Sequence, residues 1–278
     1  MGKKRLTLHI QQNTTLVRVA AIIEVVNSPN PDIDILEDIC NLKSSVLQKN
    51  VFPFLRSLAI LDTNNPPKLT ELGEIAVKIK QLNHDLLGDF FHLIIYCLHL
   101  ERPDRRFSWA YATLAQKLWL RKEVVLSPAE KKALVGEVME TAAQNFELST
   151  SEIAFSDSSI AGVLNWLRAL TPKVIESEGK AELFTRRYFC TAPIFVKAVD
   201  SIYQQQQQTY GVKIFLREKV KDTICQMLLL DPTGLDGTLD NAKRTYDYDQ
   251  GGFFDYGYEG GYGQWLMLTQ SPEWEELL

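Results

Sequence analysis

The 278-residue chain lacks any long hydrophobic run. No window of 18 uncharged apolar residues occurs, which excludes a transmembrane helix. The richest apolar stretch, residues 93–100, is too short and is interrupted by Tyr96 and His99. The first residues are basic, but no long apolar segment follows them, so we expect no secretory signal. We therefore expect a cytoplasmic protein that does not interact with membranes.

Cysteine is scarce, and its spacing excludes a disulfide framework. The four cysteines are scattered along the chain and form no C-x-x-C pair. We interpret them as reduced thiols in the core of a cytosolic protein. They are Cys40, Cys97, Cys190 and Cys225.

Motifs that carry catalysis are also missing. The sequence has no G-x-S-x-G, Walker or H-E-x-x-H pattern, and its acids have no spacing typical of a nuclease. We predict that the protein is not an enzyme and needs no cofactor. His84, His92 and His99 follow one another at intervals of eight and seven residues, whereas a zinc site on a helix uses three or four. We predict structural histidines and no metal site.

Charge is distributed unevenly. The net charge is −5, but residues 231–278 alone carry two bases against ten acids, a net of −8. The preceding 230 residues carry 28 bases against 25 acids, so the acidity belongs to the tail. A nearly neutral body permits a basic patch for nucleic acid, which an acidic body would oppose.

Helical periodicity runs through most of the chain, and breakers mark where helices end. Residues 27–31 and 62–67 are rich in Asn and Pro and cannot continue a helix. Thr70 is placed to cap a following helix. Ser127 and Glu130 form a capping-box pattern with Pro128 at the first helical position.

The N-terminal region is predicted as helix, helix, turn, helix, hairpin-like loop and helix. This order resembles the winged helix-turn-helix DNA-binding domain. The resemblance implies that Ser44 and Ser45 open the recognition helix and that a Leu-Thr-x-Leu-Gly segment is the strand leaving the wing. The residues that carry it are 35–40, 43–46, 54–61 and 68–73.

Pro53 departs from the family pattern because it lies inside the proposed recognition helix and removes a backbone hydrogen bond. Two alternatives accommodate it. In one, Asn50 caps a later helix that has Pro53 in its first turn. In the other, the recognition helix is kinked.

A second copy of this pattern is one interpretation of residues 158–203. Residues 158–170 repeat the Ser-Ser opening and the aromatic-Leu-Arg-small-Leu ending of residues 44–58. In that interpretation, residues 174–184 form a second wing centred on Gly179, and residues 193–203 form the closing helix. The alternative is a chance similarity between two helical segments.

The order of features along the whole chain resembles an uncharacterised bacterial family encoded near DNA phosphorothioation and other phage-defence genes. Its features here are the N-terminal winged helix, a Phe/His/Leu-rich helix pair from Leu86 to Leu100, a Trp-containing helix and a Ser-rich helix-turn-helix. The resemblance implies a DNA-binding accessory subunit of an antiviral defence complex.

Candidate DNA contacts follow from side-chain chemistry. Bases neutralise phosphates, hydroxyls and helix N-termini bind phosphate oxygens, and Gln or Asn can contact adenine edges. The alternative is a solvated helix face in a winged helix that binds proteins. The first set is Lys43, Ser44, Ser45, Gln48, Lys49, Asn50, Arg56 and Lys68, and the second is Ser158, Ser159, Asn165, Arg168 and Lys173.

A basic cluster at Arg102, Arg105 and Arg106 has two interpretations. With Trp109 it resembles a patch that tracks a nucleic-acid backbone and stacks a base. We favour the alternative of a surface loop, because neighbouring acids compensate its charge.

The acidic tail alternates aromatics, acids and glycines, and three interpretations are open. It docks on a partner protein, it covers a basic groove in competition with DNA, or it is an irregular loop packed on its own body. The candidate docking residues are Tyr246, Tyr248, Phe253, Phe254, Tyr256, Tyr258, Tyr262 and Trp265.

These observations predict a mainly α fold with three regions. They are a winged helix-turn-helix domain over residues 1–84, a helical domain with a possible second winged helix over 85–210, and a C-terminal helix and tail over 211–278. The expected function is non-enzymatic binding of duplex DNA within a larger assembly or a homodimer. The alternative is a protein-interaction scaffold that docks a partner through its tail.

Overall fold

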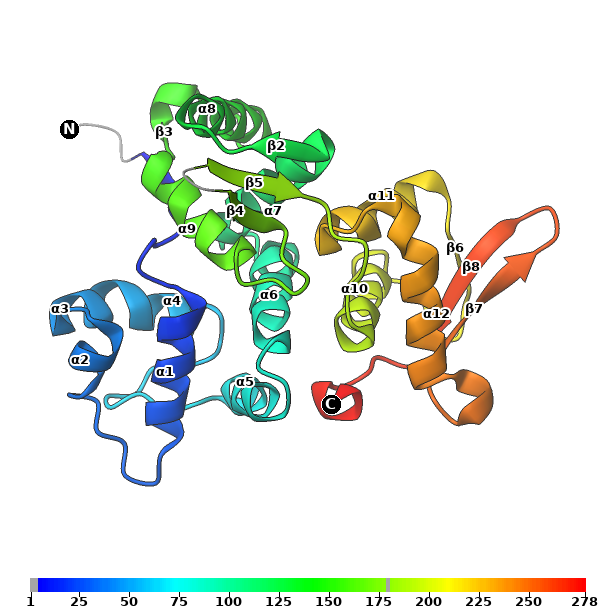
Figure 1. Cartoon of the computed structure of the whole chain (residues 1–278), viewed down its shortest axis with the longest axis horizontal. Coiled ribbons are helices and arrows are strands. Elements are labelled where there is room, and N and C mark those ends of the chain that lie inside the picture. The colour runs from blue at the N-terminus through cyan, green and yellow to red at the C-terminus, as the bar shows by residue number, and fades with distance from the viewer. Residues whose placement is uncertain (1–4, 179–180) are drawn as a thin grey trace. The chain divides into compact units, whose positions relative to one another are not determined.

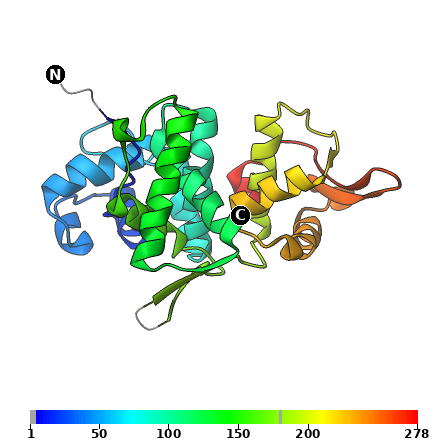
Figure 2. The same cartoon turned by 90° about the horizontal axis from the view of Figure 1, so that it is seen from above.

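The computed structural model describes residues 5–178 and 181–278 and is mainly α, which confirms the predicted fold class (Figure 1). Figure 2 shows the same chain from above, after a turn of 90° about the horizontal axis. Among the described residues, no helix combines the length and the apolarity needed to cross a bilayer.

The chain forms two compact units. Unit 1 contains Met1–Lys117 and Val125–Leu183, and unit 2 contains Leu118–Val124 and Phe184–Leu278. The boundary predicted after residue 84 lies inside unit 1, and the one predicted after residue 210 lies inside unit 2.

The N-terminal part of unit 1 is a succession of helices that begins with a short strand. The strand and the first helix are separated by eight residues that contribute Leu8 and Ile10 to the core. The elements are β1 (Leu6–Thr7), α1 (Leu16–Asn27), α2 (Leu36–Cys40), α3 (Ser44–Val46), the π-helical turn η1 (Leu47–Val51), α4 (Phe52–Ser57) and α5 (Glu71–Leu82).

Longer helices and short strands follow. Glycine permits a close approach between α6 and the end of α9, because a Cβ atom on Gly88 would lie 1.8 Å from the Ala169 carbonyl oxygen. The elements are α6 (Leu86–Glu101), α7 (Arg106–Arg121), β2 (Glu123–Val125), α8 (Pro128–Asn145), η2 (Thr150–Glu152), β3 (Ile153–Ala154), α9 (Asp157–Leu167), β4 (Ile175–Glu178) and β5 (Ala181–Thr185).

Two small sheets accompany these helices. Strands β1 and β3 pair in parallel, with Leu6 opposite Ile153. Strands β2, β5 and β4 form a three-stranded sheet in that order. The predicted second wing therefore corresponds to adjacent strands, while its central Gly179 lies outside the described residues.

An aromatic cluster joins the N-terminal helices of unit 1 to α9. The fully buried Trp166 stacks on Phe54 of α4 at 6.0 Å between ring centroids and contacts Phe91 of α6 at 5.4 Å. Phe54 also lies 5.5 Å from Phe107 of α7. Aromatic rings bury more apolar area than other side chains, so this cluster anchors α4 to α7 and α9, and α9 in turn to α6.

Unit 2 has three main helices and an antiparallel sheet in the order β6-β8-β7. Of the three interpretations of the tail, the irregular loop is wrong in its irregularity, although the tail does pack on its own body: residues 235–268 form a helix and a regular hairpin, which packs against that helix. The elements are α10 (Ala192–Gln205), β6 (Ile214–Phe215), α11 (Glu218–Leu228), η3 (Pro232–Gly234), α12 (Leu235–Tyr246), η4 (Tyr248–Gln250), β7 (Phe254–Glu259), β8 (Gly263–Leu268) and α13 (Trp274–Leu277).

Candidate nucleic-acid interface

A tight turn leads from α2 into the candidate recognition helix. Asn41 adopts a left-handed conformation with φ of 48°, which Asn tolerates better than most residues. The Leu42 amide donates back to the Glu37 carbonyl at 3.0 Å, closing the C-terminus of α2. The extended Lys43 is the N-cap of α3, so three residues, Asn41 to Lys43, separate α2 from α3.

The first half of this helix presents a polar face to solvent. Lys43, Ser44, Ser45, Gln48 and Lys49 are exposed. Positions 45, 48 and 49 lie on one helix face because they differ by three and four residues. The opposite face is buried through Leu47, Val51, Phe52 and Leu55.

A π-helical turn accommodates Pro53. In η1 the Phe52 amide donates to the Leu47 carbonyl, one residue further back than in an α-helix. The helical conformation continues through this turn, and Pro53 enters the first turn of α4, where a missing N–H costs less. Of the two alternatives for Pro53, the first is right in placing Pro53 in the first turn of a later helix but wrong in its cap, because Val51 is the N-cap and Asn50 lies half-buried inside the turn.

Arg56 holds the loop between α4 and α5. Its Nε atom donates to the Asp62 carbonyl at 2.8 Å, and its Nη2 atom donates to the Asn64 carbonyl at 2.9 Å. A predicted DNA contact is thus used inside the protein, as an anchor for the loop. The signal for a structured loop was the Asp62-Thr63-Asn64 sequence, which is typical of an Asx turn.

The same loop is closed by Asp62 and Lys68. The Asp62 amide donates to the Lys68 carbonyl, and the Lys68 amide donates to the Asp62 carboxylate, both at 2.9 Å. The Lys68 amide is the main reason why the pKa of Asp62 is lowered. Leu61 and Leu69 pair as an antiparallel bridge, so the predicted wing is a bridged loop with Lys68 exposed.

Thr70 and Gly73 join this loop to α5. The Thr70 hydroxyl accepts a hydrogen bond from the Gly73 amide at 3.2 Å, which confirms the predicted cap. A Cβ atom on Gly73 would lie 2.3 Å from the Ile60 carbonyl oxygen. The glycine of the Leu-Thr-x-Leu-Gly segment is therefore required by close backbone packing.

The second set of candidate residues is largely used within unit 1. Ser159 is 1% exposed, and its hydroxyl lies 2.9 Å from His9 Nδ1, so it presents no group to DNA. Asn165 donates to the Gln12 carbonyl at 2.9 Å. The physical reason is that the N-terminal segment covers this face of α9, which the helical pattern of α9 alone does not reveal.

The remaining members of the second set differ in exposure. Arg168 pairs with Glu182, with its Nε atom 2.7 Å from Oε1, and is half-buried. Burial tends to raise the pKa of Glu182, but hydrogen bonds from Lys131 and Arg168 lower it overall. Ser158 is half-buried beside Ser156, with 2.8 Å between the two hydroxyl oxygens, and Lys173 is exposed.

The candidate docking residues of the tail divide into a buried and an exposed group. Tyr246, Phe253 and Phe254 are 8%, 8% and 0% exposed, so they belong to the core of unit 2 and cannot dock a partner. Tyr248, Tyr258 and Tyr262 are 49%, 77% and 67% exposed.

The two half-buried tail aromatics have partners in unit 2. Tyr256 donates a hydrogen bond to Asp240, which together with burial raises its pKa to about 12. Trp265 covers Gly257 on the neighbouring strand, and Lys213 lies 4.3 Å from the centre of a Trp265 ring. The glycine in β7 leaves space for an indole that a larger side chain would displace.

The predicted structural histidines have different environments. His92 is fully buried and lies 2.7 Å from the Tyr111 hydroxyl, whereas His84 is exposed. His99 is half-buried beside Ser108, and burial lowers its pKa. In the described part of the chain, no group of three His, Cys, Asp or Glu side chains is arranged to hold a metal ion.

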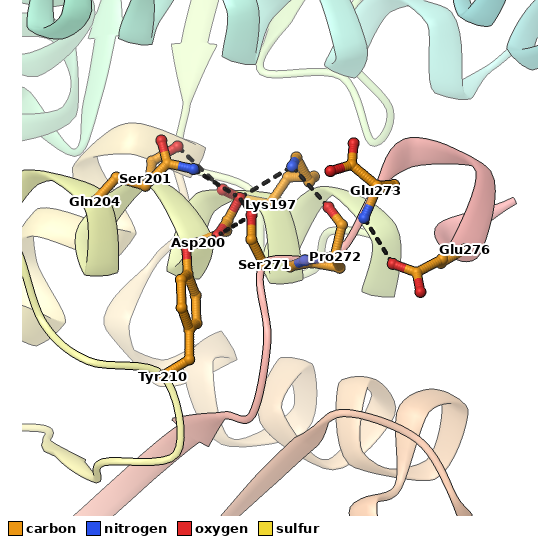
Figure 3. A network of polar contacts seen from close by, with 9 residues as sticks. All are labelled: Lys197, Asp200, Ser201, Gln204, Tyr210, Ser271, Pro272, Glu273 and Glu276. Carbon is orange, nitrogen blue, oxygen red and sulfur yellow. Dashed lines mark hydrogen bonds and ion pairs between the residues drawn. The ribbon is translucent and has the colours of Figure 1, made fainter.

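A buried ionic network lies in unit 2 around Asp200 (Figure 3). The Asp200 carboxylate is 1% exposed and accepts hydrogen bonds from Lys197 at 3.0 Å and from Tyr210 at 2.6 Å. Burial and the Asp200 carboxylate raise the pKa of Tyr210.

The same network fastens the C-terminal segment to α10. Ser271 donates to Asp200 at 3.0 Å, and Lys197 also donates to the Pro272 carbonyl at 2.9 Å (Figure 3). The serine hydroxyl and the ammonium group are thus both used in internal contacts. We interpret the network as a structural clamp.

The exposed polar face of α3 and η1, followed by the bridged loop that carries Lys68, is thus the candidate interface for nucleic acid. Of the first set, it retains Lys43, Ser44, Ser45, Gln48, Lys49 and Lys68 as exposed side chains. Comparison of the chain with protein-family models, curated proteins and solved structures gave no match.

Proposed function

We propose that the protein is a non-enzymatic, duplex DNA-binding subunit that uses the exposed face of α3 and η1. The observation that carries the proposal is the exposed set from Lys43 to Lys49, displayed on a helix that begins at a tight turn and is anchored by buried aromatics. On the resemblance described above, the larger assembly is a bacterial one that acts in defence.

The chemistry of this face suits a DNA backbone. Lys43 and Lys49 would neutralise phosphates, and the Ser44 and Ser45 hydroxyls would bind phosphate oxygens at the helix N-terminus. Gln48 would contact base edges. Lys68 would add a phosphate contact from the loop that Arg56 holds in place.

Element order supports a winged-helix arrangement for this region. Helices α1, α2 and α3–α4 are followed by a bridged loop and α5. A second succession of helices followed by a strand pair lies further along the chain. Here α7, β2, α8 and α9 precede β4 and β5, and β5 lies between β2 and β4 in the sheet. We assign DNA contact to the first region because Ser159, Asn165 and Arg168 of the second have internal partners.

Acidic side chains set a limit on affinity. Glu37 and Asp38 are exposed on α2, immediately before the candidate helix, and would repel phosphates. Three lysine contacts give an expected slope of about −2.7 for the logarithm of the association constant against the logarithm of salt concentration. Binding is therefore expected to weaken by roughly 40-fold between about 50 and 200 mM salt.

The test is fluorescence anisotropy of a labelled duplex of about 30 base pairs at these two salt concentrations. The double variant Lys43→Gln, Lys49→Gln is expected to lose at least about tenfold in affinity and to lower the slope by about 1.8. The matched control carries Lys132→Gln and Lys219→Gln, two exposed lysines outside the candidate face. Equal losses in both double variants would reject the proposed site, and no binding by the wild type would reject the function.

A second candidate function is docking of another protein through the C-terminal hairpin. It is favoured by Tyr258 and Tyr262, which stay exposed although strand β7 of the hairpin packs on α12. Tyr is enriched at protein interfaces because its ring is large and carries a polar hydroxyl. Self-association is the first case to test, by light scattering of the wild type and of Tyr258→Ser, Tyr262→Ser. A monomeric wild type at about 100 μM would exclude a homodimer of useful affinity.

A further inference from the structure

A cavity of about 890 Å³ lies in unit 1, apart from the candidate DNA interface. Its volume falls in the range of about 300–1,000 Å³ typical of small-molecule sites. Three segments far apart in sequence line it: the N-terminal strand region, the start of α7, and the loop with η2. The lining residues are Arg5, Leu6, Thr7, His9, Asp104, Arg105, Arg106, Phe107, Leu148 and Glu152.

Cationic side chains outnumber the acids in this cavity. Three arginines, Arg5, Arg105 and Arg106, line it against two carboxylates. Guanidinium groups bind phosphate oxygens through pairs of charge-assisted hydrogen bonds. The cavity therefore offers more donors for an anion than the acids around it can use.

Both carboxylates of the cavity are already engaged. Asp104 lies 3.6 Å from Arg102 Nε and 3.5 Å from Arg105 Nε. Glu152 accepts hydrogen bonds from the Ser149 hydroxyl at 2.9 Å and the Ser149 amide at 3.2 Å. They are consequently poor competitors for the guanidinium groups of Arg5 and Arg106, both exposed.

Arg105 is not fully satisfied by its neighbour. Its Nε atom is buried and forms an ion pair with the Asp104 carboxylate at 3.5 Å, but it makes no hydrogen bond, and the side chain is 31% exposed. Buried donors nearly always have a partner, and the exceptions call for a specific explanation. A bound anion that turns the Arg105 side chain toward it would supply that partner.

The rest of the wall is suited to an organic group attached to the anion. Phe107, Leu6 and Leu148 provide apolar surface next to the arginines. Phe107 is half-buried and held by Phe54, so its ring is positioned as a platform for a flat group. The cavity also lies at the start of the 16-residue α7, whose positive dipole end favours an anion.

We propose that this cavity binds a small organic phosphate of nucleotide size, with Arg105 and Arg106 holding the phosphate and Phe107 contacting the ring. Arg5 and His9 of the N-terminal segment also line the cavity. The proposal does not rest on DNA binding, because none of its residues belongs to the exposed face from Lys43 to Lys49.

The test is isothermal titration calorimetry of the full chain with adenosine 5′-monophosphate, adenosine and inorganic phosphate. We expect a Kd below about 1 mM for the monophosphate, weaker binding of phosphate alone, and none for adenosine, because the charge supplies most of the affinity. Equal affinities for the monophosphate and adenosine, or no binding of any probe up to about 10 mM, would overturn the proposal.

Variants locate the site. Arg5→Gln with Arg106→Gln changes two exposed side chains, so the fold is expected to survive, and affinity for the monophosphate is expected to fall at least about tenfold. Lys173→Gln with Arg217→Gln is the matched control, since both residues are exposed and neither lines the cavity. An equal loss in both variants would reject this site.

Two further experiments are needed. The first distinguishes a free nucleotide from a DNA end as the source of the phosphate, and the second distinguishes failure of this proposal from failure of the proposed DNA binding. Displacement of the monophosphate by a 5′-phosphorylated duplex, but not by the same duplex with 5′-hydroxyl ends, would assign the cavity to DNA ends. No displacement by either duplex supports a free nucleotide. Lys43→Gln, Lys49→Gln is expected to keep monophosphate binding even if DNA binding is lost or was never present.

Discussion

At the scale of single residues, helix caps are predictable from sequence and close backbone contacts are not. Thr70 and Ser127 cap their helices as the sequence predicts, because a cap needs only a hydroxyl beside the first turn. The role of Gly73 depends on where Ile60 lies in space. A sequence pattern shows that a glycine is present, but it does not show which backbone approaches it.

Two helical glycines make this difference measurable. Gly73→Ala places a Cβ atom 2.3 Å from a backbone oxygen and is expected to destabilise the protein by about 1–3 kcal/mol. Gly136 lies inside α8, and a Cβ atom at this position would meet nothing within 4 Å. Gly136→Ala is therefore expected to stabilise the protein by about 0.5–1 kcal/mol. Urea denaturation of both variants checks the signs, and the same sign for both would contradict the structure.

His99 predicts a pH dependence of stability. Burial lowers its pKa below the usual value of 6.5, so the unfolded chain binds this proton more tightly than the folded one. Its contribution to stability is therefore complete above about pH 6.5 and is lost as the pH falls through the folded pKa. His99→Gln is expected to lessen the loss of unfolding free energy between about pH 7.5 and 5. An unchanged pH profile in this variant would contradict the assignment.

At the scale of elements, helix positions were predictable and the tail was not. Breaker clusters and apolar periodicity located α1, α5 and α8 because both signals are local. The C-terminal hairpin escaped prediction because glycines and acids obscure its alternation. Gly257 weakens the strand pattern, yet it lies beneath Trp265 of β8 in the folded hairpin.

Substitutions in the tail separate its buried and exposed aromatics. Phe254 is fully buried and lies 6.0 Å from Phe195, so Phe254→Ala is expected to cost about 3–5 kcal/mol of unfolding free energy. The matched pair Tyr258→Ser, Tyr262→Ser is expected to change it by less than about 0.5 kcal/mol per residue. Thermal and urea unfolding measure both, and a large loss in the tyrosine variant would place these rings in a core.

The loop between α4 and α5 offers a test of what Arg56 does. Arg56→Gln removes two hydrogen bonds to the Asp62 and Asn64 carbonyls. Amide hydrogen exchange is expected to become faster over residues 62–68. If the proposed function holds, DNA affinity is expected to fall by a few-fold, because Lys68 is less well positioned. Hydrogen exchange measures the first effect directly. Unchanged exchange in the variant would show that the loop is held by Asp62 alone.

At the scale of the whole molecule, the fold class was predictable and the division of the chain was not. Composition and periodicity indicate a mainly α protein, whereas the division follows from long-range packing. Phe54 of the predicted first domain stacks on Trp166 of the predicted second, so both belong to unit 1. Of the candidate site, the six exposed residues of the first set of eight were predictable from side-chain chemistry. The internal partners of Arg56, Ser159 and Arg168 were not, because helical periodicity does not show which loop, strand or N-terminal segment packs against each side chain.

The tail is part of the core of unit 2, so its removal is expected to damage that unit. A chain that ends at Leu230 lacks α12 and the β7–β8 hairpin, which bury Phe195 and supply the Leu268 amide that donates to the Tyr203 hydroxyl. We expect the truncated chain to lose cooperative unfolding. We also expect trypsin to cleave rapidly at the lysines and arginines that lie beyond residue 184. A truncated chain that resists trypsin as well as the wild type does would contradict this packing.

The pairing of β1 with β3 has a consequence for the order of events during synthesis. Leu8 and Ile10 are fully buried, and His9 meets Ser159 at a separation of 150 residues along the chain. At about 5–20 residues per second, a ribosome needs roughly 8–30 s to make the segment that covers them. For that time the apolar N-terminal segment is exposed on the nascent chain, where a holding chaperone has its opportunity to bind.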